Sequence, residues 1–514
     1  DLHRGDRRQR QMCIRDSTCF NCSLNSFSQT LKSSEIQSLV DEKFMEAVTN
    51  LHHFLRLPND GNFPIQIEKN KAWCDSVFTL LNFKTLTIKT DGAPLLFAEK
   101  IYHQNRKSIL FYLQIDGQPI DSSAWSQNSP YEPILKEHKN GIWSQVEFDM
   151  QQEHFNEDIR IFARSASDSK GPAMSLISAL QILQEQNINP EYNVKVIMDF
   201  QEELGSPDLP QAVLNNQELL KAEMLLIMDG TRHLSNLPTL TYGARGITTA
   251  TIKVFGPKNA LHSGQYGNYA PNPVFKAAEL ISSLKDENGI VLIPEFYKGV
   301  NLSTRDRELL ASIPENIDSL KNRLGISKPD QVAATYQEAL QFPSLNVRGL
   351  SAGWTGKEVR TIIPEEVIIE IDMRLVPETP AERQLMLLRS HIIKQGFFLV
   401  DSMPTKEQRA TNDKLASFSY RIGSKPFRTN MDGTIATFLN KSLQKVFGER
   451  IIHMRTTGGS QPMAPFIEAL NIPAVSVRIP NPDNNIHAPN ENLRLGNYKE
   501  GITSCLAILT EPLP

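Results

Sequence analysis

The stretch from Val194 to Pro207, V-K-V-I-M-D-F-Q-E-E-L-G-S-P, constrains the fold of this chain more than any other. A short apolar run bounded by turn residues is typical of a strand that is buried on both faces of a parallel sheet. Two adjacent carboxylates, Glu202 and Glu203, follow the run. Ligands of open α/β sheets bind beyond the carboxyl ends of the strands, so we expect this pair at a functional edge. Neighbouring residues there point in different directions, which lets one glutamate hold a metal while the other moves a proton.

Strand and helix patterns alternate on both sides of this stretch. Apolar residues at helical spacing predict helices over residues 34–57, after Lys170 and over residues 435–446. Apolar runs predict further strands at residues 94–98, 108–115, 224–228 and 474–479. Such alternation indicates an α/β fold, a mostly parallel sheet between two helical layers, which we interpret as a three-layer catalytic domain.

The pattern changes at Gly246. Residues 247–255 and 367–373 alternate between apolar and polar, and helical spacing runs from Val274 to Leu284. These features are typical of a smaller α+β domain whose sheet has one solvated face. We therefore predict a non-native or disordered segment at 1–30, a catalytic domain at 31–245 and 377–514, and an inserted domain at 246–376.

Composition narrows the function classes. The chain has 514 residues, of which 40% are hydrophobic, and a formal net charge of −4, which gives no electrostatic footprint for nucleic acid. No window approaches the roughly 20 apolar residues of a membrane span. The first residues resemble a sequence scar that could have replaced a signal peptide, so a cytoplasmic and an exported location both remain open.

Polar residues follow the predicted strands at five separate places. They are Gln114 with Asp116, Asp168, the Glu202–Glu203 pair, Asp229 and His487. If the strands belong to one parallel sheet, these side chains meet at one edge. Clustered carboxylates repel one another unless a cation holds them, so this arrangement predicts a metal site.

The motifs around these residues resemble one family. F-A-R-S-A-S-D-S-K-G-P (162–172) is similar to the G-A-S-D-D-K-G-P segment of the co-catalytic zinc metallopeptidases that include carnosinase-like dipeptidases, carboxypeptidase G and aminoacylase. Further matches follow in that family's order from about residue 35 to the end of the chain: E-E-L-G-S (202–206), T-Y-G-A-R-G (241–246), L-H-S-G (261–264), P-N-P (271–273), T-I-I-P (361–364), D-M-R-L-V-P (372–377), G-G-S-Q-P (458–462) and H-A-P-N-E-N (487–492). The resemblance implies a metallopeptidase, a dipeptidase or carboxypeptidase-like exopeptidase.

The resemblance also implies roles at the metal centre. Asp168 would bridge two zinc ions, Glu203 and His487 would complete one site, and Asp229 would belong to the other. Glu202 would act as the general base on a metal-activated water. Zinc lowers the pKa of bound water to about 7, where a carboxylate can accept its proton.

The inserted domain would be the family's lid and dimerisation domain, which implies a homodimer. On that model His262 reaches the partner subunit's active site and stabilises the tetrahedral intermediate, with Thr361 beside it. Arg374 and Ser460 would bind the carboxylate of the substrate, since the planar arginine fork pairs with a carboxylate at two places.

One position departs from the family. Where the family carries G-H-x-D-x-x-P, this chain has L-Q-I-D-G-Q-P (113–119), so Gln114 replaces a metal-binding histidine. An amide oxygen is a poorer zinc ligand than imidazole and suits harder cations. The second position would hold manganese, magnesium or cobalt, hold zinc weakly, or hold no metal. Asp116, which orients that histidine in the family, would either orient Gln114 or bind metal itself.

Three functions are compatible with these features. The first is a metallopeptidase that cleaves a dipeptide or short peptide. The second is the same chemistry on an N-acyl amino acid. The third is a catalytically impaired homologue with a binding role. Gln114 favours the third, whereas retention of the base Glu202 together with His262 argues against it.

Overall fold

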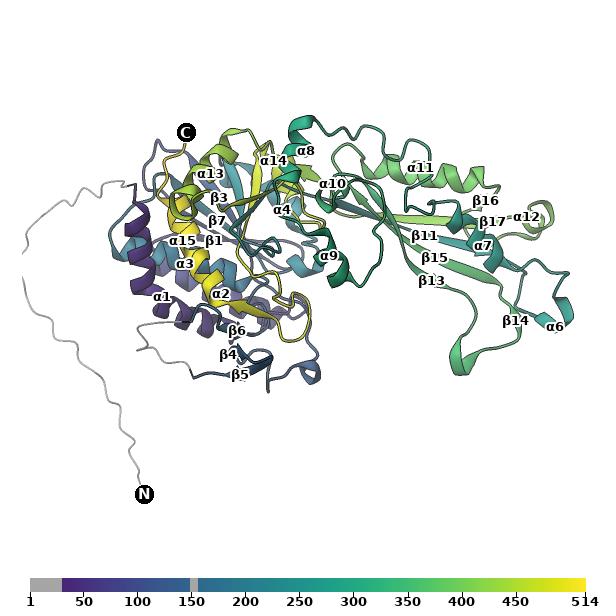
Figure 1. Cartoon of the computed structure of the whole chain (residues 1–514), viewed down its shortest axis with the longest axis horizontal. Helices are drawn as coiled ribbons and strands as arrows, with labels where there is room; N and C mark the ends of the chain where they lie inside the picture. Colours follow the sequence, from purple (N-terminus) through teal and green to yellow (C-terminus); the bar gives the residue numbers. More distant parts are fainter. Residues whose placement is uncertain (1–29, 148–155) are drawn as a thin grey trace, which may run out of the picture.

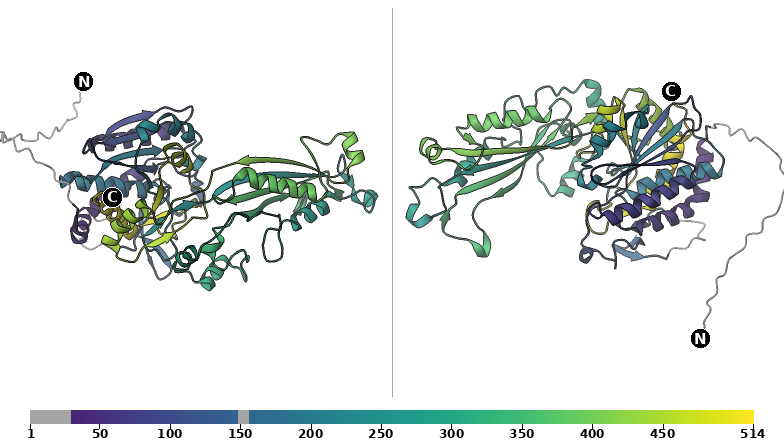
Figure 2. Two further views of the ribbon diagram at one scale, coloured as in Figure 1. Left: turned by 90° about the horizontal axis from the view of Figure 1, so that it is seen from above. Right: turned by 180° about the vertical axis from the view of Figure 1, so that it is seen from behind.

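The computed structural model describes residues 30–147 and 156–514, and the predicted N-terminal segment at 1–30 lies outside them except for its last residue. The described residues form two units (Figure 1). One unit is built on an eight-stranded sheet and the other on a five-stranded sheet. Figure 2 shows from two further directions that the second unit extends away from the first.

The eight-stranded sheet is parallel at its centre, and the strands towards both edges, β1–β2 on one side and β9–β19 on the other, join this centre through antiparallel pairs. The central strands β7, β3, β8 and β20 are parallel neighbours, which confirms the predicted mostly parallel core. In spatial order the sheet contains β1 (Lys84–Ile88), β2 (Leu95–Lys100), β7 (Asn193–Asp199), β3 (Ser108–Gln114), β8 (Met224–Ile227), β20 (Ala474–Arg478), β9 (Thr239–Thr241) and β19 (Ile452–Met454).

Helices cover both faces of this sheet. Side chains alternate along each strand, so Ile109 and Phe111 of β3 point into one core while Leu110 and Tyr112 point into another. The first core is closed by α1 (Ser33–Leu55), α2 (Pro64–Leu80), α3 (Lys170–Glu185), α13 (Thr434–Phe447) and α15 (Leu495–Leu509). The second is closed by α4 (Leu209–Asn215), α5 (Gln217–Leu220) and α14 (Ala464–Leu470). The strands therefore lie in the middle of three layers.

A small four-stranded sheet, which the sequence analysis did not predict, brings two distant loops together. Its order is β21 (Asn492–Arg494), β6 (Arg160–Phe162), β4 (Ile134–Lys139) and β5 (Ile142–Gln145). Asn492 pairs with Phe162 across β21 and β6. The loop that follows β6 and the loop that precedes β21 are thereby held side by side, and they carry Asp168 and His487.

The second unit has one covered sheet face. Its order is β13 (Ser344–Ser351), β15 (Glu366–Leu375), β11 (Gly246–Phe255), β17 (Leu415–Ile422) and β16 (Phe398–Val400). Alternate residues such as Ile252 and Ile369 are buried beneath α7 (Pro273–Ser282) and α11 (Ala381–Lys394). The remaining helices of this unit are α6 (Ser263–Tyr266), α8 (Thr304–Ala311), α9 (Ile317–Leu324), α10 (Tyr336–Ala339) and α12 (Lys406–Thr411).

The far boundary of this unit differs from the prediction. The insert was predicted to end at residue 376, but β16 and β17 lie beyond that residue and pair within the second sheet. The chain returns to the first unit only where β18 (Phe427–Arg428) pairs with β10 (Gly243–Ala244). We therefore propose that the inserted domain runs from residue 246 to about residue 422. Within the described part of the chain, no helix is long and apolar enough to cross a membrane.

Candidate metal centre

The two glutamates after β7 lie on a 3-10 turn, η2 (Glu202–Leu204), which the Asp116 carboxylate holds in place. The backbone N–H of Glu202 donates to Oδ1 of Asp116 and that of Glu203 donates to Oδ2, each over 3.0 Å. Burial, and then the charge of Asp199, raise the pKa of Asp116 to about 8. Asp116 makes no hydrogen bond to Gln114 among the described residues, so it positions the glutamates instead of orienting Gln114.

Asp168, Glu203 and His487 come together although they are distant in sequence. Nε2 of His487 lies 2.9 Å from Oδ2 of Asp168 and 3.3 Å from Oε2 of Glu203. One ligand atom from each residue lies within 4.8 Å of the other two. Gln118, which the sequence analysis did not select, donates from Nε2 to Oε2 of Glu203 over 2.7 Å. The His487 side chain is 54% exposed, so the cluster offers three candidate ligands and has one open side, as is typical of a catalytic metal site.

The electrostatics of this cluster favour a bound cation. Burial, and then the charge of Asp168, raise the pKa of Glu203 to about 10 and that of Asp229 to about 6. Burial also opposes ionisation of Asp168, but the hydrogen bond with His487 brings the Asp168 pKa below its usual value and raises the pKa of His487. A divalent cation would offset the repulsion among the carboxylates, so the donor set fits a metal.

Asp229 follows β8 and lies on the other side of Asp168. Oγ of Ser169 is 2.9 Å from Oδ1 of Asp168 and 2.5 Å from Oδ1 of Asp229, so this hydroxyl joins the two carboxylates. Nε2 of Gln461 lies 3.5 Å from Oδ2 of Asp229. Gln114, the last residue of β3, is buried, and neither polar atom of its amide has a hydrogen-bond partner in the described part of the chain.

Glu491 fixes the loop that carries Asp168, and the sequence analysis missed this role. Its fully buried carboxylate accepts hydrogen bonds from the backbone N–H groups of Ser165, Ser167 and Asp168, each over 2.9 Å. Nη1 of Arg164, also buried, lies 2.7 Å from Oε2 of Glu491. The only available signal was its place in H-A-P-N-E-N, four residues after His487.

Arg374 and Ser460 meet where the two units join. Nη1 of Arg374, from β15, donates to Oγ of Ser460 over 3.2 Å. Its acidic neighbour is Asp372, whose Oδ1 lies 4.0 Å from Nε of Arg374. The guanidinium therefore keeps donors for a further acceptor, and the geometry is compatible with the predicted carboxylate-binding role.

His262 and Thr361 lie together but far from the metal centre of their own chain. Strand β12 (Leu261–His262) pairs with β14 (Ile362–Ile363), and the N–H of Ser263 donates to the carbonyl of Thr361 over 3.1 Å. Figure 1 places β14 and α6 at the end of the second unit that is remote from the first. His262 is exposed, and its Nδ1 accepts from the N–H of Gly264.

Comparison with known families shows to which family the chain belongs. The model of peptidase family M20/M25/M40 matches residues 111–511 of the chain. The chain belongs to this peptidase family. The resemblance predicted from the ordered motifs is thereby confirmed, and so is the class of enzyme, a peptidase.

Individual M20 relatives cover most of the chain. The Cys-Gly metallodipeptidase dug1 of Schizosaccharomyces pombe is 26% identical over 487 residues, which is 91% of this chain and 96% of the relative. The human Beta-Ala-His dipeptidase is 25% identical over 426 residues, 81% of this chain and 77% of the relative. The structure of the M20 family metallo-carboxypeptidase Sso-CP2 from Sulfolobus solfataricus has 28% identity and a TM-score of 0.73, covering 91% of this chain and 99% of that one.

A cavity of about 930 Å³ lies where the two units of this M20 peptidase join. It is lined by Ser206, which follows the glutamate turn, by Gln461, and by Thr248 and Arg421 of the second sheet. None of the site residues predicted from the sequence lines this cavity, and its link to the candidate metal centre is Gln461, whose Nε2 lies 3.5 Å from Oδ2 of Asp229.

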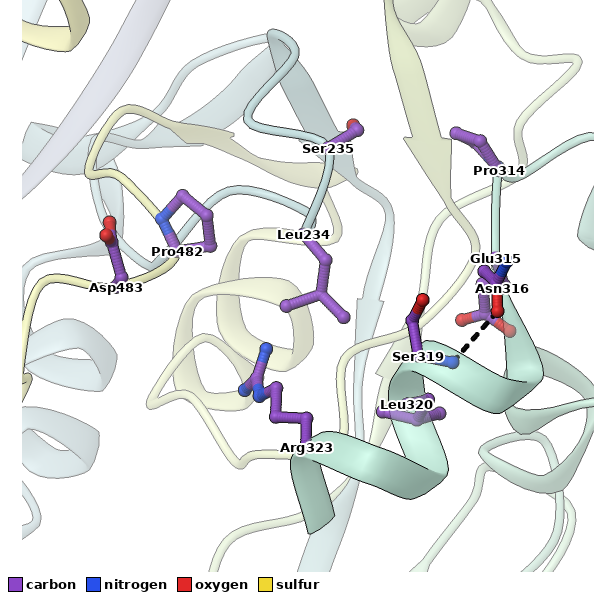
Figure 3. Close-up of a pocket in the computed structure, with 10 residues that line it drawn as sticks. All are labelled: Leu234, Ser235, Pro314, Glu315, Asn316, Ser319, Leu320, Arg323, Pro482 and Asp483. Atoms are coloured by element: carbon purple, nitrogen blue, oxygen red, sulfur yellow. Dashed lines mark hydrogen bonds between the residues drawn. The ribbon is translucent and has the colours of Figure 1, made fainter.

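A second cavity, of about 660 Å³, lies between α9 and the loops at residues 234–235 and 482–483. Figure 3 shows Leu234 and Pro482 on one side and Arg323 and Leu320 on the other. None of the site residues predicted from the sequence lines this cavity. It is therefore distinct from the candidate metal centre, although Pro482 and Asp483 belong to the same loop as His487.

Proposed function

We propose that this chain is a metal-dependent peptidase that hydrolyses the peptide bond of a dipeptide or short peptide with Glu202 as the general base. The observation that carries the proposal is the position of Glu202, which directly precedes a ligand of the Asp168–Glu203–His487 cluster on a turn fixed by Asp116. No donor among the described residues hydrogen-bonds to the Glu202 carboxylate, which leaves it able to accept a proton.

The relatives support a peptide substrate over an N-acyl amino acid, because those described above are dipeptidases or a carboxypeptidase. The intact three-ligand cluster supports a working enzyme over an impaired homologue. The same cluster would hold zinc, while Asp229 and Gln114 would contribute to a second position shared through Asp168.

Each residue then has a defined task. A bound zinc ion would supply a Lewis acid that lowers the pKa of water to about 7 and polarises the peptide carbonyl. Glu202 accepts a proton from the attacking water and delivers it to the departing amine. Asp116 holds the Glu202 backbone, and Glu491 holds the loop of Asp168, so both act through the residues they position.

The rate should depend on the ionisation of Glu202. Burial, and then the charges of Asp229 and Asp168, raise the pKa of Glu202. A bound cation acts against this rise, because it attracts the ionised carboxylate. A base must be ionised to accept a proton, so kcat/KM of the metal-loaded enzyme should fall as the pH drops through the pKa of Glu202. The residual activity of Glu202→Gln should lack this acidic limb, because the amide does not ionise. An acidic limb at the same pH in the variant would exclude Glu202 as the group that produces it.

Arg374 is proposed to bind the carboxylate of the substrate. Arg374→Lys keeps the charge but loses the planar fork, and should raise KM for a dipeptide about 10- to 100-fold, as expected for one hydrogen bond to a charged group. The matched comparison uses the dipeptide and its C-terminal amide, which lacks the carboxylate. The wild type should prefer the free acid, and the variant should lose most of this preference. An unchanged preference would place the carboxylate elsewhere.

The second unit is proposed to form a homodimer in which His262 enters the partner's site. The remote position of His262 within its own chain supports this arrangement, as do large exposed side chains on the same unit, including Tyr269 at 87% and Phe275 at 71% exposure.

Mixing two inactive variants tests the exchange of His262. Glu202→Gln chains retain His262, and His262→Ala chains retain Glu202. If His262 acts across the dimer, each mixed dimer has one complete site, so random reassociation should restore roughly a quarter of the wild-type sites. Glu202→Gln mixed with Asp168→Ala is the control and should restore nothing, because each substitution disables the metal centre of the chain that carries it. Absence of recovery in reassociated mixed dimers would contradict the cross-subunit role.

A further inference from the structure

The buried amide of Gln114 is an anomaly that calls for a ligand. Gln114 is 3% exposed, and its Oε1 and Nε2 have no hydrogen-bond partner among the described residues. Buried polar groups in native proteins are nearly always paired, and an exception points to a bound water or ion. Another carboxamide at this edge, Gln461, is paired on both atoms, with Asp229 and with Ser476. The missing hydrogen-bond partners are therefore a feature of Gln114 and are not shared by Gln461.

Strand register places Gln114 beside Asp229 at the edge of the sheet. Tyr112 of β3 pairs with Ile227 of β8, and Gln114 and Asp229 each follow two residues later. Gln114 still belongs to β3 and points to the same face as Tyr112, whereas Asp229 lies in the loop just beyond β8. The two residues therefore lie next to each other where these neighbouring strands end. Asp229 is in turn joined to Asp168 by the hydroxyl of Ser169.

Every donor at this position is oxygen. Asp168 and Asp229 offer carboxylates, Gln114 an amide oxygen and Ser169 a hydroxyl, whereas the position on the other side of Asp168 has the nitrogen of His487. Carboxylate, carbonyl and hydroxyl oxygens suit Mn²⁺ and Mg²⁺, while imidazole suits zinc. The chain's own substitutions thus make the two positions chemically unlike.

We propose that this chain has an asymmetric metal centre: a zinc position at Asp168, Glu203 and His487, and an oxygen-only position at Gln114, Asp168 and Asp229 that is selective for a hard divalent cation such as Mn²⁺. Ser169 is the fourth oxygen of the second position, and it adds a donor without the negative charge of the aspartate found in the motif. The inference rests on the proposed function for the zinc position, which shares Asp168.

Metal titration of the full chain tests this proposal without reference to turnover. Protein freed of metal by a chelator is given zinc and then Mn²⁺, bound zinc is counted by elemental analysis, and bound Mn²⁺ is followed by loss of the free-ion electron paramagnetic resonance signal. The expected result is one tight equivalent of zinc and one of Mn²⁺ per chain. Two tight equivalents of zinc that exclude Mn²⁺, or no second metal of any kind, would overturn the proposal.

Variants assign the Mn²⁺ to Gln114. Gln114→Ala should weaken Mn²⁺ binding and keep the equivalent of bound zinc. The loss in affinity should be at least about 10- to 100-fold, which is the usual effect of removing a residue that only hydrogen-bonds to a metal ligand. Gln114→Glu should strengthen Mn²⁺ binding, and Gln114→His should let a second zinc displace Mn²⁺. Gln145→Ala is the matched control, since Gln145 also ends a strand but is exposed. Mn²⁺ binding that is insensitive to all three Gln114 variants would overturn the proposal.

The two proposals fail in different ways. If the zinc equivalent itself is missing, or peptide cleavage does not need it, the proposed function is wrong. If zinc binds and cleavage depends on it while Mn²⁺ binding fails these tests, only the asymmetric centre is wrong.

Discussion

Glu202→Gln is expected to lower kcat on a cleaved dipeptide by about 100- to 10,000-fold, the usual contribution of a general base. The amide keeps the shape of the side chain but cannot accept a proton at neutral pH. Metal content should not change, because the proposed ligands are Asp168, Glu203 and His487 and the turn is held through the backbone N–H of residue 202. Steady-state kinetics together with elemental analysis of the same sample measure both effects.

Glu218→Gln is the matched control for this experiment. It makes the same change on α5, at an exposed residue, and should leave kcat and metal content at wild-type values. Full activity of Glu202→Gln on a purified substrate would show that the assigned base is wrong. Loss of metal together with loss of activity would instead make Glu202 a ligand.

Removing the Glu491 carboxylate should have the largest effect on stability. Glu491→Ala leaves the buried Arg164 charge without its ion-pair partner. It also leaves the N–H groups of Ser165, Ser167 and Asp168 without their acceptor. Breaking a buried pair from one side costs about 3–5 kcal/mol, so the free energy of unfolding should fall by about that amount. Urea unfolding of the metal-free protein measures the loss, and metal affinity should fall as well because Asp168 is no longer held.

Glu468→Ala provides the comparison at an exposed pair. Glu468 lies 2.8 Å from Nζ of Lys425, but both side chains are more than half exposed. Its loss should cost at most about 1 kcal/mol. Glu491→Gln keeps the shape of the side chain and removes its charge, so its loss in the free energy of unfolding should lie between those of Glu491→Ala and Glu468→Ala. A Glu491→Ala variant as stable as Glu468→Ala would mean that the Arg164–Glu491 pair does not hold the Asp168 loop.

The parts of the fold with local signals were predictable. The strand over residues 193–199 and the helix that begins at Lys170 are where the apolar patterns placed them, because each pattern reflects burial on one or both faces of its own element. The two sheets were likewise distinguishable, since continuous apolar runs mark the doubly covered sheet and alternation marks the half-covered one. Because polar residues follow several strands of the parallel sheet, they could also be predicted to meet at one edge of it.

Long-range pairing was not predictable from the sequence. Strand β17 joins β11 across a large separation in sequence, and its exposed Tyr420 and Ile422 give no clear inward face, so the insert was ended too early. Glu491 was missed for a related reason. A glutamate in a polar loop reads as solvated, and only the small sheet that joins β21 to β6 places it beneath the Asp168 loop.

The most direct test of the account is to measure metal content and dipeptide hydrolysis on the same purified sample, with zinc, manganese or cobalt added in turn. We expect at least one equivalent of metal per chain, cleavage that a chelator abolishes and added metal restores, and loss of this metal in His487→Ala. A sample with no bound metal and no cleavage of any dipeptide under any addition would contradict the proposed peptidase function and favour a binding role for this M20 fold.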